Sequence, residues 1–158
     1  MSISKGKQFE NKFFHDWQET FLDSFIYRLN DQVSGYKSSS RNICDFICFN
    51  KDTLYLIECK SSQDNTWNFS AYSQYEKQLV KVGIPGVRVG VVLWMVKHDT
   101  VVYLPTKTIQ RMKAENKKSF NIKDLDNDTY RIIKVPSIKK RVFMDSDYSI
   151  LFNLKEGD

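Results

Sequence analysis

Long apolar runs are missing from this sequence. No window of about 18 residues is apolar enough to form a transmembrane helix. The first residues, MSISKGKQFENKFF, carry charges where a secretory signal would need an uninterrupted apolar run. We therefore expect a cytoplasmic protein that does not associate with membranes.

Cysteine and histidine are scarce, with three and two residues in the 158-residue chain. Structural zinc needs four closely arranged nitrogen or sulfur ligands, so this composition argues against a zinc site. An odd number of cysteines without a secretory signal predicts reduced thiols rather than a disulfide framework. Strand pairing is expected to place Cys44 opposite Cys59 on one apolar face of a sheet.

Glycine and proline are also few, with six and three residues, and no low-complexity tract or long linker divides the chain. We therefore expect one domain over residues 1–158. Hydrophobic residues make up 41% of the chain, which is enough to build a core. Lysine and arginine outnumber the acidic residues by 24 to 19, and the net charge of +5 favours a partner rich in phosphate.

The spacing of apolar residues predicts alternating helices and strands. A helix is expected over residues 5–29, because aromatic side chains recur at every fourth position: Phe9, Phe13, Trp17, Phe21 and Phe25. Residues 30–41 are polar and rich in turn formers, which predicts a surface loop. Two strands should follow within residues 42–61, then helices at 70–82 and 106–117, strands at 87–96 and 100–104, and one or two more strands from 129 onward. This order predicts an α/β fold with a mixed central sheet flanked by helices.

One stretch, NICDFICFNKDTLYLIECKS at residues 42–61, places three charges among apolar neighbours. With a turn at residues 50–53, antiparallel pairing would put Asp45 opposite Glu58. Lys60 would lie on the same face, because side chains alternate along a strand. A solvated strand end is the ordinary alternative, but the apolar flanks on both strands argue against an exposed edge.

Two carboxylates at these positions would repel each other. Directly opposed residues have Cβ atoms roughly 4.5–5.5 Å apart, and the repulsion is a few kcal/mol at an effective dielectric of about 20. A proton on one acid would relieve it, and so would a hard cation. Mg²⁺ commonly binds one or two carboxylates together with a substrate phosphate. Lys60 could then hold the attacking water or neutralise charge on the phosphate.

At these residues the sequence resembles a known family. Asp45, thirteen residues before Glu58-Cys59-Lys60, is similar to the D…(D/E)xK signature of the PD-(D/E)xK nucleases. The strings GKQFENKF, NICDFICF, LIECKSS, NFSAYSQYEKQL and VVYLP resemble RecU-type Holliday-junction resolvases. The resemblance covers roughly residues 5 to 115 and implies a restriction-endonuclease-like core.

The resemblance also implies roles for individual residues. Asp45 and Glu58 would bind Mg²⁺, for which Mn²⁺ could substitute, with the backbone carbonyl of Cys59 as a further ligand. Lys60 would position or activate the water. Glu10 would be the acidic residue of the first helix, and Gln74 the glutamine on the helix after the signature; for both, a solvated surface position is the alternative. The activity implied is nicking of a DNA four-way junction by a homodimer, which leaves 5′-phosphate and 3′-hydroxyl ends.

One departure from the RecU family concerns the segment before Asp45. RecU proteins carry a long stalk there, whereas this chain has only the loop at residues 30–41, closer in length to the compact archaeal resolvases. Within this loop Lys37 and Arg41 are predicted to contact phosphates, unless they are simply solvated. Two other functions therefore stay open: a nuclease for ends, flaps or foreign duplex, and a non-cleaving DNA-binding accessory protein of recombination.

Overall fold

The computed structural model describes residues 3–29 and 42–154. Six strands form a central sheet in the order β1-β2-β3-β5-β6-β8. Only β3 and β5 pair in parallel, and the other neighbours are antiparallel, so the predicted mixed sheet is confirmed. The strands are β1 Phe25–Arg28, β2 Phe46–Asn50, β3 Thr53–Ser62, β5 Val87–Met95, β6 Thr100–Pro105 and β8 Ile133–Val135.

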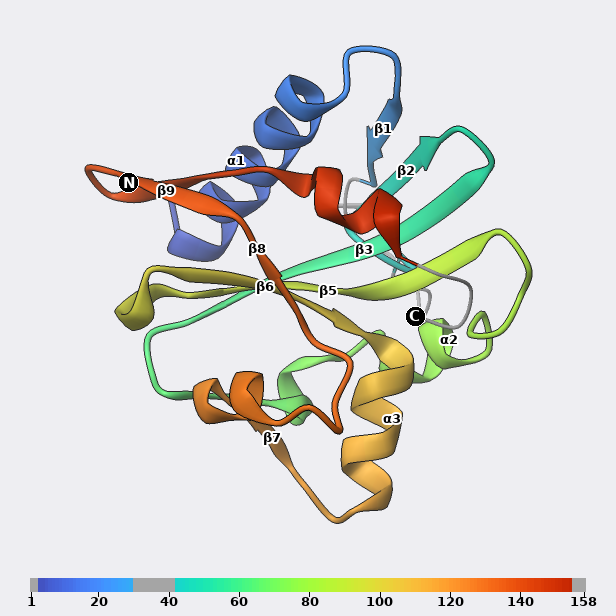
Figure 1. Cartoon of the computed structure of the whole chain (residues 1–158), viewed down its shortest axis with the longest axis vertical. Coiled ribbons are helices and arrows are strands. Elements are labelled where there is room, and N and C mark those ends of the chain that lie inside the picture. Colours follow the sequence, from blue (N-terminus) through green and yellow to red (C-terminus); the bar gives the residue numbers. More distant parts are fainter. Residues whose placement is uncertain (1–2, 30–41, 155–158) are drawn as a thin grey trace, which may run out of the picture.

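Helices cover both faces of this sheet (Figure 1). One core cluster joins α1 (Lys5–Thr20) to one face, and a second joins α3 (Thr106–Ala114) to the other. Along β5, Val92 and Trp94 face α1, while Val91 and Leu93 face α3, as strand alternation requires. The smaller elements are β4 Thr66–Asn68, η1 Phe69–Ala71, α2 Tyr75–Leu79, η2 Val96–His98, β7 Ser119–Asn121, η3 Ile122–Asp126, β9 Ser137–Lys140, β10 Phe143–Ser146 and η4 Tyr148–Asn153. No helix in the described part of the chain is long and apolar enough to span a membrane.

The first helix is shorter than its aromatic spacing predicts. It ends at Thr20, and the residues after the following turn form β1, so the prediction of a helix to residue 29 is wrong. The indole Nε1 of Trp17 donates to Ser24 Oγ at 3.0 Å, which holds the turn against the helix. Phe25 then belongs to a strand, where aromatic and β-branched residues are favoured.

The strand pairings predicted for the β2–β3 and β5–β6 hairpins are confirmed. The β2–β3 pair has the expected register, with Phe49 opposite Leu54 and Asn50 opposite Thr53 across the turn. The β5–β6 pair is antiparallel across residues 97–99, also as expected. The helix predicted at 70–82 is instead two short pieces, η1 and α2.

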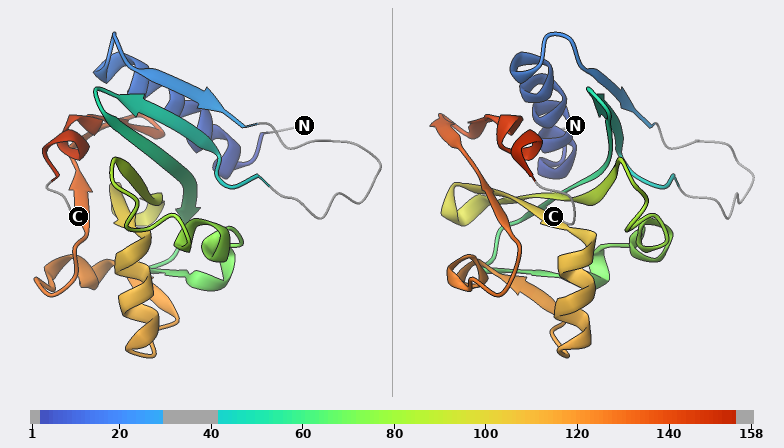
Figure 2. Two further views of the ribbon diagram at one scale, coloured as in Figure 1. Left: turned by 90° about the vertical axis from the view of Figure 1, so that its right-hand side faces the viewer. Right: turned by 45° about the vertical axis from the view of Figure 1, so that its right-hand side comes forward.

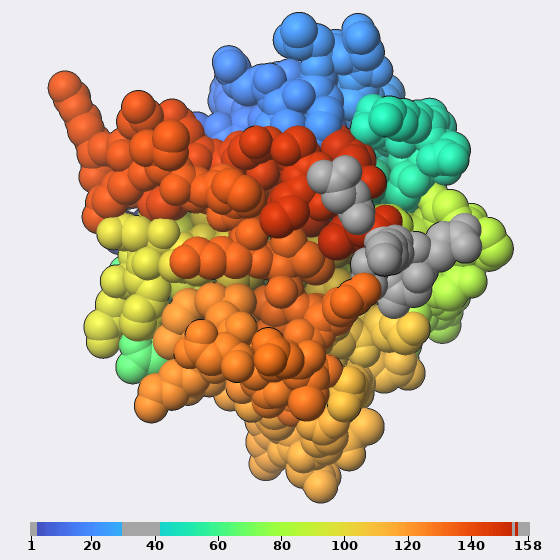
Figure 3. All heavy atoms as spheres, viewed as in Figure 1, coloured from blue at the N-terminus to red at the C-terminus, as the bar shows by residue number. Residues whose placement is uncertain are grey.

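The C-terminal part of the chain is more ordered than its sequence indicates. After β8 it forms the β9–β10 ribbon and η4, whose Tyr148 and Leu151 are fully buried. Figure 3 shows this segment, in orange and red, lying across one side of the molecule next to the blue helix α1. Lys37 and Arg41, the predicted phosphate contacts, lie outside the described residues.

Candidate active site

Three of the predicted site residues meet where β2 begins and β3 approaches its end. Glu58 and Lys60 lie on the same face of β3, as alternation predicts. The Lys60 ammonium is 3.0 Å from Glu58 Oε1. Glu58 is only 1% exposed, whereas a quarter of the Lys60 side chain remains accessible. A buried carboxylate is thus paired with a lysine that reaches solvent.

Asp45 reaches these residues through an irregularity in the strand. The regular register ends with Phe46 opposite Ile57, yet the Asp45 amide also donates to the Ile57 carbonyl at 3.1 Å. Two consecutive residues therefore oppose one, which is the arrangement of a β-bulge. Asp45 does not continue the regular ladder opposite Glu58 as expected; its Oδ2 instead accepts the Cys59 amide at 2.8 Å.

The same irregularity corrects the predicted pairing of Cys44 with Cys59. Cys44 packs with Leu56 and Val89, whereas Cys59 belongs to the cluster around α1 on the other face. A one-residue slip moves a side chain to the opposite face of a sheet, which explains the change. The three cysteines are free and buried.

The Glu58 carboxyl is under electrostatic strain. Burial first, and then the neighbouring charge of Asp45, raise its pKa from 4.5 to about 7, although Lys60 opposes the shift. Its Oε2 is buried and meets no hydrogen-bond donor among the described residues. The shift favours the protonated form of this carboxyl near neutral pH when no cation is bound.

Glu10 extends the group of acids from the neighbouring helix. Its charge also raises the pKa of Glu58, although less than burial and Asp45 do. The carboxylate is held in an ion pair by Arg28 of β1, whose guanidinium also donates to Asn11 Oδ1 at 2.7 Å. Glu10 thus lies near the site and is fixed by an arginine that the sequence did not single out.

A buried glutamine of α2 that the sequence did not single out, Gln78, supports the site. Gln74 is half-buried at the start of α2 and accepts a hydrogen bond from Ser73 Oγ. Gln78 is fully buried; its Nε2 donates to the Ile43 carbonyl at 2.8 Å, and its Oε1 accepts from the Tyr72 hydroxyl. Gln78 therefore anchors the segment two residues before Asp45. Gln78 lies three residues after the buried Tyr75, and this helical spacing is the sequence signal that could have indicated its burial, although not its partner.

Replacing Gln78 with leucine should therefore weaken both the fold and the site. The Ile43 carbonyl and the Tyr72 hydroxyl would lose their buried partner, and we expect the free energy of unfolding to fall by about 2–3 kcal/mol. Gln74→Leu is the matched control and should change it by less than about 0.5 kcal/mol. Urea denaturation of the two variants measures both values, and equal losses would contradict the anchoring role of Gln78.

The donor set of this site suits a hard divalent cation. Asp45 and Glu58 offer carboxylate oxygens, the ligand type that Mg²⁺ prefers, and one of these oxygens is buried without a donor. The described residues contain no ready-made group of three or more His, Cys, Asp or Glu side chains for a metal. An ion held here would thus use backbone oxygen, water and substrate oxygens to complete its coordination, as Mg²⁺ sites usually do.

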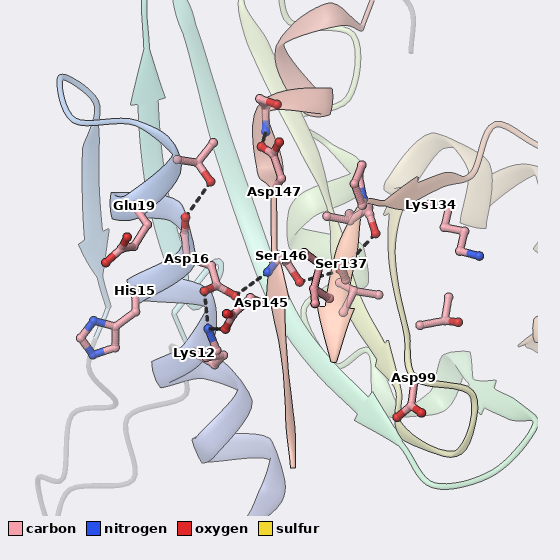
Figure 4. Close-up of a pocket in the computed structure, with 17 residues that line it drawn as sticks. Lys12, His15, Asp16, Glu19, Asp99, Lys134, Ser137, Asp145, Ser146 and Asp147 are labelled. Carbon is pink, nitrogen blue, oxygen red and sulfur yellow. Dashed lines mark hydrogen bonds and ion pairs between the residues drawn. The ribbon is translucent and has the colours of Figure 1, made fainter. Parts of the chain in front are cut away.

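A large pocket lies elsewhere, between α1 and the β9–β10 ribbon. It has a volume of about 1310 Å³ and is lined by five acidic side chains but only two lysines. Figure 4 shows the Lys12 amine between the carboxylates of Asp16 and Asp145, at 2.5 and 2.6 Å. Because acids predominate and the lysine is already paired, this cavity is poorly suited to a phosphate backbone.

The mixed sheet with helices on both faces is a restriction-endonuclease-like fold, and it carries an acid–acid–lysine group near a strand end. No protein-family model matches the chain, and no curated protein does. Among solved structures, it is similar to Hjc, a Holliday junction resolvase of the archaeal hyperthermophile Archaeoglobus fulgidus. The TM-score is 0.52 at 20% identity, over 74% of this chain and 87% of that chain. The predicted fold class is confirmed, while the narrower resemblance to RecU stays a prediction.

Proposed function

We propose that this chain is a metal-dependent DNA endonuclease that resolves Holliday junctions. The observation that carries the proposal is the strained pair of Asp45 and Glu58, in which a buried Glu58 oxygen has no donor and Lys60 is 3.0 Å from the other. Burying the Glu58 carboxylate beside the charge of Asp45 is unfavourable unless a cation or proton relieves the pair. The fold shared with a Holliday junction resolvase supports the same conclusion.

The residues of the site would divide the work of phosphodiester hydrolysis. Asp45 and Glu58, with the Cys59 carbonyl, would hold Mg²⁺. When bound, the ion would lower the pKa of water and neutralise charge on the phosphate. Lys60 would orient the attacking water from the solvent-accessible side, and its charge would stabilise the transition state. The products would carry 5′-phosphate and 3′-hydroxyl ends.

The substrate would be DNA with a four-way branch. The net charge of +5 suits a phosphate backbone, and Lys37 and Arg41 are our proposed phosphate contacts. A four-way junction is resolved by two symmetric incisions, so two copies of the chain would act together. Gln74 is proposed to lie near the substrate at the start of α2.

The deciding experiment compares a labelled four-way junction with a linear duplex of the same arm sequence during a Mg²⁺ titration. We expect symmetric nicks in the junction, little cutting of the duplex and no cutting in EDTA. Equal cutting of both would favour a nuclease of broader substrate range. Binding that weakens as salt rises, without any cutting, would favour the accessory DNA-binding protein.

A further inference from the structure

The β9–β10 ribbon ends in a tip with three consecutive cations. Lys139 and Lys140 are the last residues of β9, and Arg141 begins the turn to β10. Residues 137–144 contain no acidic side chain. Figure 3 shows the orange ribbon projecting beyond the rest of the molecule at the upper left. The tip is therefore a concentrated positive charge held out in solvent, which suits a negatively charged partner.

The ribbon is anchored at its base and close to its turn, so the tip has a fixed place. Ser146 donates its amide to Asp16 Oδ2 of α1 at 3.1 Å, and its hydroxyl lies 2.8 Å from that of Ser137. Next to the turn, the Phe143 ring packs on Trp94 of β5 with centroids 5.8 Å apart. In the right view of Figure 2, the ribbon lies beside the blue helix α1, on the side of the sheet away from α3.

The tip lies toward the same end of the sheet as the candidate active site. Trp94 pairs with Ser61 of β3, the residue after Lys60. Strand spacing and the ring contact together place the tip within roughly 25 Å of Lys60, and one turn of a DNA duplex is about 34 Å long. Lys60 points away from α1, so a duplex bound there would reach the tip by crossing the end of the sheet, where η2 lies.

The turn at the tip keeps an arginine where glycine would fit more easily. Arg141 has φ +38°, in the left-handed region that residues with a Cβ rarely adopt. Two-residue hairpin turns usually place Asn or Gly at such positions. Holding another residue there is unfavourable, and such positions persist mainly where they serve a function. A solvated turn has no need of this arginine, whereas an anionic partner would.

Two of the three cations are available to such a partner. Lys139 donates to Asp99 Oδ2 at 2.9 Å, in an exposed and therefore weak ion pair. Within the described residues, no ion pair holds Lys140 or Arg141. Asp145, the acid of β10, is already neutralised by an ion pair with α1. The charge at the tip is thus not cancelled by the acids that line the nearby cavity.

We propose that the ribbon tip binds a duplex arm of the DNA substrate, with Lys140 and Arg141 on its phosphates. The inference rests on the proposed function for the identity of the partner and adds a contact away from the active site. The major groove of DNA is about 12 Å wide and admits a two-stranded β-ribbon, so the tip fits this partner in shape as well as in charge. The ribbon follows residues 5–115, over which the chain resembles the resolvases, so the resemblance does not imply this contact.

Arg141→Gly tests the contact without disturbing the turn. Glycine adopts a positive φ readily, so the variant should melt within about 2 °C of the wild type. Its affinity for a labelled four-way junction, measured by fluorescence anisotropy in EDTA, should fall at least about five-fold at about 0.1 M salt. The slope of log K against log salt should become shallower by about 1, because one phosphate contact is lost, and adding Lys140→Gln should bring this change to about 2. A loss of affinity with an unchanged slope would contradict phosphate contacts.

Lys51→Gly is the matched control. Lys51 has φ +55° in the turn between β2 and β3, so this substitution also removes one positive charge and relieves one left-handed residue. The turn precedes β3, whereas the ribbon tip and Lys60 lie toward the other end of that strand. The control should keep the wild-type slope and an affinity within about two-fold of the wild type. Equal losses in both variants would reflect net charge alone and would overturn the inference.

The same variants separate this inference from the proposed function. If the wild type never cuts a junction in Mg²⁺, yet Arg141→Gly weakens binding and lowers the slope, the nuclease is overturned and the ribbon contact stays. If the wild type cuts and Arg141→Gly binds like the control, the ribbon contact is overturned and the nuclease stays. A wild type that binds no DNA would overturn both.

Discussion

Asp45→Asn is expected to reduce cleavage of a four-way junction at least about 1000-fold while DNA affinity stays within about two-fold. Metal-ion stabilisation of the transition state is worth several kcal/mol, and each 1.36 kcal/mol changes a rate tenfold. Asparagine keeps an oxygen that can accept the Cys59 amide, now 2.8 Å from Asp45 Oδ2, so the strand should fold as before. The variant removes the negative charge and replaces one carboxylate oxygen with an amide nitrogen, which is a poor ligand for Mg²⁺.

The measurement pairs single-turnover cleavage in Mg²⁺ with fluorescence anisotropy of labelled junction in EDTA. Asp52→Asn is the matched control, because Asp52 lies in the exposed turn of the same hairpin. It should cleave like the wild type. If Asp45→Asn cut at the wild-type rate, Asp45 would not belong to the site, and the accessory-protein hypothesis would gain support. If Asp45→Asn also lost DNA affinity, the effect would be on binding rather than on chemistry.

The predictions that succeeded depend on neighbours in sequence. Alternation along residues 46–50 and 53–62, with a turn between them, is enough to predict which residues of β2 and β3 oppose each other. It also places Glu58 and Lys60 on one face. The β5–β6 hairpin follows from the same reasoning, since its strands are separated by only four residues.

The predictions that failed concern features without a local signal. The bulge at Asp45 involves no glycine, and the residues on both sides of Asp45 are apolar. The sequence therefore does not indicate that one residue is displaced from the regular pairing. Arg28 reaches Glu10 only because the chain reverses between α1 and β1. Gln78 bonds Ile43 across 35 positions of sequence, a pairing that periodicity does not predict.

The contribution of Glu58 to the stability of the metal-free protein is expected to fall as pH rises from about 4.5 to about 7. In this range the unfolded chain releases the Glu58 proton, whereas the folded protein keeps it, because burial and Asp45 raise the folded pKa to about 7. Below 4.5 both states are protonated and the acid has no effect on stability. Above pH 7 the carboxyl is charged in both the folded and the unfolded state. The free energy of unfolding is then lower by the full penalty of roughly 3 kcal/mol.

Glu58→Gln should remove this part of the pH dependence and abolish cleavage. Urea denaturation in EDTA across pH 5 to 8 would measure the slope for both proteins. Burial also raises the pKa of Asp16, but that contribution is common to both and cancels in their difference. At pH 8 the variant should be the more stable protein in EDTA, by up to roughly 3 kcal/mol. If the free energy of unfolding had the same pH dependence in both proteins, the raised pKa of Glu58 would be contradicted.

Saturating Mg²⁺ should then reverse the order of stability. A cation that binds the folded wild type stabilises it by about 4.1 kcal/mol at 1,000 times its dissociation constant, which exceeds the roughly 3 kcal/mol advantage of the variant in EDTA. The variant lacks one carboxylate ligand and should gain much less. The gain should grow with pH, because the ion competes with the proton on Glu58. If Mg²⁺ stabilised both proteins equally, the ion would bind away from Glu58. That result would contradict the cleavage chemistry proposed for this end of β3.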